Sequence, residues 1–182
     1  MKITLVTISM AVFLTGIHAD VQPQKNFDLK KFAGKWYRVG LAYDSPSFAR
    51  YRKKLTVCMG LVEPTETGDV IMTVWKTKSS TCQKEVFRYE KTTSPGMFTY
   101  FSTRHNKVKD ITVVETNYTE YALIFKYKKF NKEYSQVSLY GRTQKLRPEL
   151  LEKFKRYARQ QGFSEESIIT PALADSCPTG GH

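Results

Sequence analysis

The pattern of apolar and polar residues predicts eight short β-strands through the middle of the chain. Runs of β-branched and aromatic residues recur at close intervals, and turn formers such as Ser94-Pro95-Gly96 separate several of them. The predicted strands are residues 36–42, 55–62, 70–75, 85–89, 97–101, 111–114, 121–127 and 134–140. Short strands at hairpin spacing, with no helix between them, indicate an all-β antiparallel meander, closed as a barrel or split as a sandwich.

An amphipathic helix is predicted after the last strand. It begins near Pro148 and ends at Gly162, and the apolar residues at helical spacing are Leu150, Leu151, Phe154, Tyr157 and Ala158. The strand segment Leu123-Ile124-Phe125 is apolar on both faces, so its outer face needs a covering element. We therefore predict that the helix packs on the sheet rather than on a membrane or a partner.

The first 19 residues have the plan of a secretory signal peptide. Lys2 gives a basic start, an apolar run extends from Ile3 to Leu14, and the small residue Ala19 precedes the predicted cut. This run is too short to span a bilayer as a stable helix, and no other stretch is apolar enough to do so. We predict a signal peptide over residues 1–19, one domain over residues 20–182, and a secreted protein whose cysteines are oxidised.

Composition and charge exclude several classes of function. The 182 residues include 29 Lys+Arg, 17 Asp+Glu and three His, with a formal net charge of +12. So few histidines exclude a His-rich metal site, and no segment resembles a nucleotide-binding loop, so we predict no metal and no cofactor. The basic run at residues 50–54 lies in a long loop without a recognition helix, which argues against a nucleic-acid partner.

Three short signatures stand at informative places along the predicted strands. Gly34-Lys35-Trp36 opens the first strand, Thr116-Asn117-Tyr118 follows the sixth, and Arg142 ends the eighth. In this order they resemble the three motifs of the lipocalin family. The resemblance implies an eight-stranded up-and-down calyx with a C-terminal α-helix packed on the barrel, closed at one end by the packing of Trp36 against Arg142. A barrel of this size holds one small ligand, so the implied function is binding a lipophilic molecule.

The resemblance implies different roles for the three cysteines. Lipocalins commonly join the cysteine after the third strand to one beyond the helix, which implies a disulfide between Cys82 and Cys177. Cys58 is left over in the second strand. It is either a buried apolar residue or a reactive thiol, and the residues alone leave both interpretations open.

Within the family, the segments 113–118 and 139–144 and the residues around Cys58 are similar to the branch of lipocalin-type prostaglandin D synthases. That branch isomerises an endoperoxide with a barrel thiol, so the resemblance implies a catalytic Cys58 and a thiol-assisted isomerase as the second hypothesis. Those enzymes surround the thiol with hydroxyl side chains, whereas this chain has Arg38, Gly60 and Val74. The difference favours a carrier. The Arg38 cation either favours the thiolate or binds a ligand carboxylate.

The remaining candidate ligand contacts follow from strand alternation and from the resemblance. If Cys58 and Arg142 face inward, then so do Thr56, Gln136, Ser138 and Tyr140. Met72 and Val74 on the third strand are also assigned to the cup. By similarity to siderophore-binding lipocalins, Lys126 and Lys128 are expected to face into the cup. This supports a siderophore-binding defence protein as a third hypothesis. The alternative is a solvated basic rim.

Our first hypothesis is a secreted, monomeric carrier of a small lipophilic acid, such as a fatty acid, retinoic acid or a prostanoid. A basic mouth would steer such anions toward the cup. A cell-surface receptor is a further partner that the sequence leaves open. Asn117-Tyr118-Thr119 is an N-glycosylation sequon, which fits an exported glycoprotein and predicts modification of Asn117.

Overall fold

The computed structural model describes residues 21–78, 81–102, 106–128, 134–173 and 177, so the predicted signal peptide lies outside the described part. All eight predicted strands are present, and most are longer than expected. Their bounds are β1 (Gly34–Tyr43), β2 (Cys58–Pro64), β3 (Val70–Lys78), β4 (Thr81–Lys91), β5 (Met97–Ser102), β6 (Lys107–Thr116), β7 (Tyr121–Lys128) and β8 (Tyr134–Gly141).

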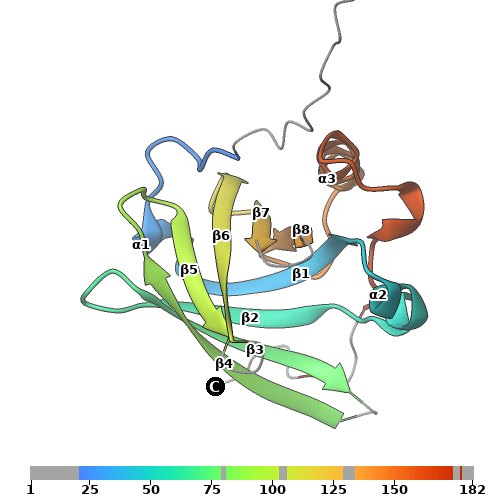
Figure 1. Cartoon of the computed structure of the whole chain (residues 1–182), viewed down its shortest axis with the longest axis horizontal. Coiled ribbons are helices and arrows are strands. Elements are labelled where there is room, and N and C mark those ends of the chain that lie inside the picture. Colours follow the sequence, from blue (N-terminus) through green and yellow to red (C-terminus); the bar gives the residue numbers. More distant parts are fainter. Residues whose placement is uncertain (1–20, 79–80, 103–105, 129–133, 174–176, 178–182) are drawn as a thin grey trace, which may run out of the picture.

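The strands form one antiparallel barrel. Each strand pairs with the next along the chain, and β1 pairs with both β8 and β2, which closes the sheet (Figure 1). This confirms the predicted eight-stranded calyx and decides between barrel and sandwich. A ninth strand, β9 (Ile168–Ile169), pairs with β1 at Leu41 and Ala42 on the outside of the barrel and had no counterpart in the sequence prediction.

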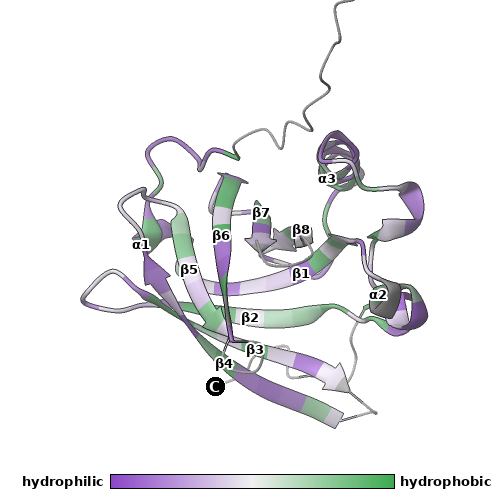
Figure 2. Ribbon diagram, viewed as in Figure 1, coloured by the Kyte–Doolittle hydropathy of each residue, from purple (hydrophilic) through white to green (hydrophobic). Residues whose placement is uncertain are grey.

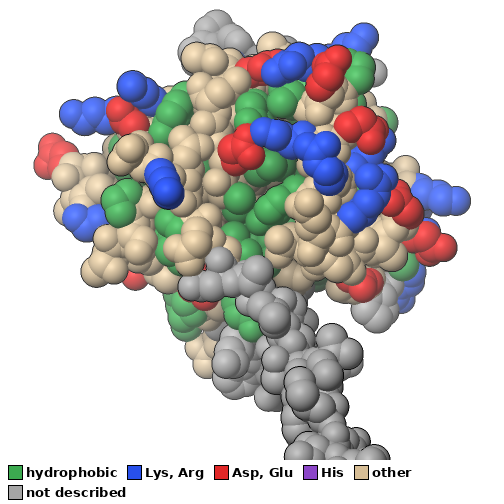
Figure 3. Space-filling model, turned by 90° about the horizontal axis from the view of Figure 1, so that it is seen from above, with side chains coloured by type: hydrophobic (Ala, Val, Ile, Leu, Met, Phe, Trp, Pro, Cys, Tyr) green, Lys and Arg blue, Asp and Glu red, His purple; other side chains and the backbone are tan. Residues whose placement is uncertain are grey.

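The C-terminal helix covers the barrel as predicted. Helix α3 (Pro148–Gln160) buries Leu150, Phe154 and Ala158, and Phe154 packs directly over Gly40 of β1. A Cβ atom at Gly40 would lie 2.8 Å from the Phe154 ring, so the missing side chain allows the close approach of the helix. In the face shown in Figure 3, Lys and Arg side chains gather on the side that carries α3.

The prediction that no helix interrupts the strands is wrong between β1 and β2. Helix α2 (Pro46–Tyr51) and the 3-10 turn η1 (Arg52–Lys54) lie there, and a short helix α1 (Leu29–Phe32) precedes β1. The Ser45 side chain caps α2 by accepting a 3.0 Å hydrogen bond from the Phe48 backbone. Phe48 is only 2% exposed, so its burial stabilises a helix too short to show helical periodicity in the sequence.

Two apolar layers explain why β7 is apolar on both faces. Leu123 belongs to the outer layer beneath α3, whereas Ile124 belongs to the layer inside the barrel. The inner layer is concentrated toward the end closed by α1 and includes Trp36 and Phe98. β4 differs from its neighbours, since it is mostly hydrophilic (Figure 2) and most of its residues are exposed.

The segment after α3 ties the barrel wall together. The predicted disulfide joins Cys177 to Cys82, which lies in β4 opposite Thr77 rather than in the connection after β3. Further back along this segment, the Ala172 carbonyl accepts a 2.8 Å hydrogen bond from the Val57 backbone just ahead of β2. The C-terminal segment therefore bonds to the wall at β1, just ahead of β2, and at β4.

Candidate ligand-binding cavity

The end of the barrel beside α1 is closed by Trp36 and Arg142. The central carbon of the Arg142 guanidinium lies 3.7 Å from the centre of the Trp36 ring. The same guanidinium donates hydrogen bonds to the backbone carbonyls of Lys35 (2.8 Å), Ala33 (3.0 Å) and Tyr118 (2.8 Å). A cation stacked on an indole, with its donors bound to two chain segments, makes a rigid floor.

A small apolar compartment lies directly on this floor. It has a volume of about 50 Å³, and Trp36 forms part of its base. The other apolar side chains that line it are Phe32, Val62, Val70, Met72, Phe98, Ile111, Val113 and Ile124. Such a surface accepts hydrocarbon and offers little to a polar group.

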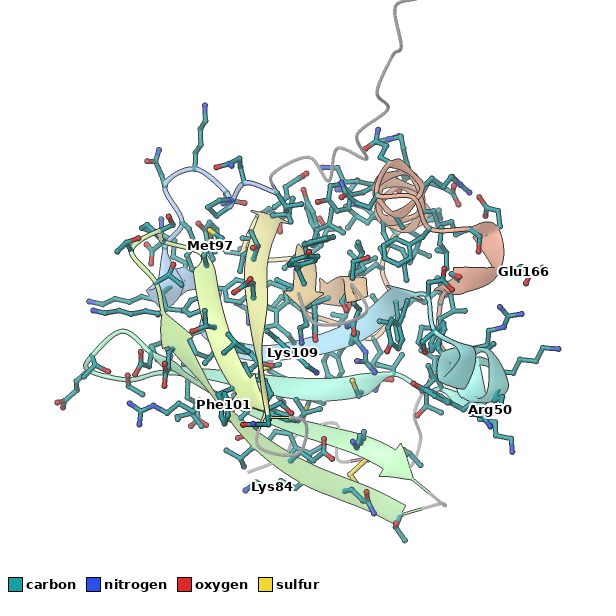
Figure 4. The ribbon with its side chains drawn as sticks, viewed as in Figure 1. Arg50, Lys84, Met97, Phe101, Lys109 and Glu166 are labelled. Carbon is teal, nitrogen blue, oxygen red and sulfur yellow. A yellow bond between two sulfur atoms is a disulfide. The ribbon has the colours of Figure 1, made fainter. Side chains whose placement is uncertain are left out.

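A larger and more polar compartment, of about 220 Å³, lies above it. The two compartments share five lining residues, so they adjoin each other inside the barrel; these residues are Met72, Tyr89, Ile111, Lys126 and Tyr140. The residues that line the upper compartment alone are Arg38, Cys58, Gly60, Val74, Lys76, Glu85, Phe87, Tyr100, Lys109 and Gln136. In Figure 4, Lys109 is seen among the surrounding strands.

The upper compartment carries positive charge beside neutral phenols. The Lys126 ammonium lies 5.7 Å from the centre of the Tyr89 ring, and Lys76 forms a 2.7 Å ion pair with Glu85. Burial raises the pKa of both Tyr89 and Tyr140 above the ordinary value for tyrosine, so both phenols stay protonated at neutral pH. The groups available to an anion are therefore the cations and the phenolic hydroxyls.

Seven of the ten predicted ligand contacts line this cavity: Arg38, Cys58, Met72, Val74, Lys126, Gln136 and Tyr140. Ser138 is fully buried and accepts a 2.8 Å hydrogen bond from the Gln136 side chain, but it does not line the cavity. Thr56 does not line it either, because β2 begins only at Cys58 and the alternation rule does not extend to residue 56. Lys128 ends β7, and its side chain lies outside the described part.

Cys58 and Arg38 stand directly opposite each other on β2 and β1. The thiol-bearing residue is 4% exposed, and both residues line the upper compartment. Gly60 is opposite Val74, and a Cβ atom at Gly60 would lie 2.5 Å from the terminal methyl of Met72. The Met72 thioether therefore fills the space that a larger side chain would occupy at position 60.

Several cavity residues were not singled out from the sequence. The largest missed set is aromatic and lies on β4 and β5, namely Phe87, Tyr89 and Tyr100. The alternation Glu85, Phe87, Tyr89 in a predicted strand was a signal for one inward face, because residues two apart point to the same side. Lys109 was missed because the sixth strand was predicted to begin at residue 111, whereas β6 begins at Lys107.

The Thr116-Asn117-Tyr118 signature forms the turn between β6 and β7. Tyr118 has a positive φ of 65°, and its hydroxyl accepts a 3.0 Å hydrogen bond from the Asp28 backbone. The exposed Asn117 accepts hydrogen bonds from the backbones of Glu120 (2.9 Å) and Tyr121 (3.0 Å). The signature thus connects the N-terminal segment to the closed end. Glycosylation of Asn117 stays a prediction.

A barrel closed at one end around an apolar cavity defines the class of β-barrel proteins that bind small ligands. Residues 33–175 match the model of the Lipocalin / cytosolic fatty-acid binding protein family, and the chain belongs to this family, whose barrels bind small hydrophobic ligands. Within the described ranges, no helix is long and apolar enough to cross a membrane. The same ranges contain no group of three or more His, Cys, Asp or Glu residues suited to a metal ion.

Named relatives cover almost the whole chain. A "Lipocalin" of Rhinella marina is 38% identical over 162 residues, which is 88% of each chain. A "Prostaglandin-H2 D-isomerase" of Equus caballus is 33% identical over 184 residues, covering 94% of this chain and 95% of the relative. The solved structure described as "The Siderocalin Ex-FABP functions through dual ligand specificities" superposes with a TM-score of 0.71 at 24% identity. It covers 81% of this chain and 97% of that one, and it supports the fold alone.

Proposed function

We propose that the protein is a secreted carrier of a small lipophilic acid. The observation that carries the proposal is a barrel interior with two adjoining compartments, an apolar one on the floor and a cationic one above it. A hydrocarbon tail on the floor would be stabilised by removal of its surface from water. A carboxylate above it would be stabilised by Arg38 and Lys126, since hydrogen bonds to charged groups are stronger than those between neutral groups.

Fluorescence of the floor residue Trp36 tests this function. The chain contains two tryptophans, and the second, Trp75, lies beneath Lys84 on the outside of the barrel and does not line the cavity. In a Trp75→Phe variant, fatty acids and retinoic acid should therefore change Trp36 emission in a saturable way. If no lipophile in such a panel changes the emission or is retained on gel filtration, the carrier function is wrong.

Secretion and glycosylation are part of the same proposal, and they have separate tests. Expression in a secreting eukaryotic cell should yield a medium protein that begins at Asp20. An N-glycosidase should reduce its mass, and an Asn117→Gln variant should lack that response. An intracellular product that retains Met1 would contradict export without bearing on ligand binding.

A second candidate function, prostaglandin isomerisation, is supported by the position of Cys58. The thiol-bearing residue lines the cavity opposite Arg38, and several relatives bear the name prostaglandin-H2 D-isomerase. Purified protein incubated with the endoperoxide and a free thiol should then form product, and Cys58→Ala should abolish turnover. Equal turnover by the two proteins would remove this function while leaving the carrier function untouched.

The third hypothesis, siderophore binding, gains Lys109 as a further cavity cation beside Arg38 and Lys126. A coloured ferric siderophore would then elute with the protein on gel filtration. Elution of the colour only in the small-molecule fraction, at micromolar protein, would contradict this hypothesis.

A further inference from the structure

The wall of the barrel has one weakly paired seam in its described part, between β4 and β5. β4 pairs with β3 at nine successive positions, from Tyr89 opposite Val70 to Thr81 opposite Lys78. It pairs with β5 at only two positions, Glu90 with Thr99 and Lys91 with Phe98. β5 in turn pairs with β6 along its full length. The backbone ladder therefore joins β4 to β5 only near the closed end and not along the upper compartment.

Three aromatic rings bridge this seam on the inside. The Tyr100 ring of β5 makes edge contacts with Phe87 at 5.4 Å and with Tyr89 at 5.8 Å between ring centres. Phe87 and Tyr89 lie on β4, with their own ring centres 6.4 Å apart. All three rings line the upper compartment. Here side-chain contacts take the place of backbone hydrogen bonds, and a ring can change rotamer without breaking a strand pairing.

The outer side of the same region carries exposed apolar side chains. Val86 of β4 is 58% exposed, Phe101 of β5 is 51% exposed, and Val108 of β6 is 53% exposed. Phe101 and Val108 are opposite each other in the β5–β6 register, and Figure 4 shows Phe101 beside β4 and β5. A lipophilic molecule arriving from water would find apolar contacts here before it reached the interior.

We infer that the β4–β5 seam is a lateral entrance to the cavity, with Phe87, Tyr89 and Tyr100 as its gate. The inference rests on the proposed carrier function and adds the route and the ligand shape. A flexible hydrocarbon chain passes between the gate rings tail first, and its anionic head stays last, near the cavity cations. Phe87, Tyr89 and Tyr100 thus set the rate of ligand exchange rather than the affinity.

Stopped-flow binding of a fluorescent polyene fatty acid tests the gate. Tyr100→Ala removes both cross-seam ring contacts, so its association and dissociation rates should each rise roughly five- to tenfold, with little change in Kd. Tyr140→Ala is the matched control, because it removes the same ring from the same cavity but lies on β8. It should not raise both rates together. Parent-like rates in Tyr100→Ala would overturn the gate.

A disulfide across the seam should have the opposite effect to Tyr100→Ala and slow ligand exchange. Continuing the β4–β5 register places Arg88 opposite Phe101. In a Cys58→Ser background, oxidised Arg88→Cys/Phe101→Cys should therefore slow both rates relative to the Cys58→Ser parent. If the crosslinked protein exchanges ligand at the parent rate, the ligand uses another route and the inference is wrong.

Backbone hydrogen exchange tests the seam without any ligand. Amides of residues 84–88 and 100–102 should exchange faster than those of residues 122–127 in β7, which pairs there with both β6 and β8. Equal protection would show that the seam does not open. If the parent binds no lipophile at all, the carrier function itself fails, whereas binding with unchanged rates and protected amides refutes only the entrance.

Discussion

Among the residues that the structure describes, Lys126 is the one cation that lines both compartments of the cavity. Its ammonium lies over the Tyr89 ring, at the level where the apolar floor gives way to the polar chamber. A ligand carboxylate at this level would leave its tail on Trp36. At the scale of the single residue, Lys126 is therefore the side chain expected to distinguish an acid from the matching neutral lipid.

The prediction compares a fatty acid with the alcohol of the same chain length. Lys126→Gln should weaken binding of the acid roughly tenfold and leave the alcohol nearly unchanged, because a charge-assisted hydrogen bond is lost. Lys84→Gln, whose cation lies over Trp75 outside the cavity, should change neither affinity. Titration of Trp36 emission measures both, and equal losses for acid and alcohol would show that Lys126 acts by shape alone.

Arg142 stabilises the closed end by stacking on Trp36 and by donating hydrogen bonds to several backbone carbonyls. Arg142→Ala should lower the free energy of unfolding by about 2–4 kcal/mol, since it removes the stacking on Trp36 and leaves several backbone carbonyls without donors. Arg147→Ala, which breaks an exposed ion pair with Glu120, should cost much less. Denaturant unfolding measures the two; similar losses would contradict the special role of Arg142.

At the scale of elements, α3 is held to the barrel by a polar cluster as well as by its apolar stripe. Lys153 of α3 donates hydrogen bonds to Glu115 of β6 and to the Tyr121 hydroxyl of β7, the latter at 3.0 Å. Tyr121 also donates to Glu115. Burial raises the pKa of the Glu115 carboxyl, but the hydrogen bonds from Lys153 and Tyr121 lower it by more, so its pKa lies below the ordinary 4.5.

This shift predicts an acid-dependent attachment of the helix. A carboxyl with a lower pKa in the folded than in the unfolded chain stabilises the fold above about pH 4.5, and the stabilisation is lost as the pH falls through the folded pKa. The stability difference between the parent and Glu115→Gln should thus be largest near pH 7 and shrink toward pH 3. Glu152→Gln, an exposed partner of Lys155, should show a smaller change. Constant differences across this range would contradict the prediction.

At the scale of the whole molecule, one covalent link and a C-terminal segment hold the wall in place. The Cys82–Cys177 disulfide closes a chain separation of 95 residues. Cys82→Ser/Cys177→Ser should lower the free energy of unfolding by about 4–5 kcal/mol, because the unfolded chain regains the entropy of a long loop. Thermal and denaturant unfolding measure the loss, with Cys58→Ala as the control that keeps the disulfide. A loss equal to that of the control would show that the link does not stabilise the fold.

The strands and the helix could be predicted because their signals are local, whereas the closed end followed from the family resemblance. β-branched and aromatic runs identify all eight barrel strands, and apolar spacing identifies α3. Helix α2 escaped prediction because its stability comes from the burial of Phe48. Strand alternation could not place Thr56, because it lies ahead of β2 and bridges to Ala172, which is far away in the sequence.

The sequence by itself therefore determined the eight strands and α3 and, through the family resemblance, the barrel, the disulfide partners and seven of the residues that line the cavity. Only the tertiary structure decided that Arg38 faces Cys58, that Met72 fills the space beside Gly60, and that β4 and β5 barely pair. The physical reason is that alternation indicates which residues share a face, whereas register and cross-strand packing arise only once distant segments meet.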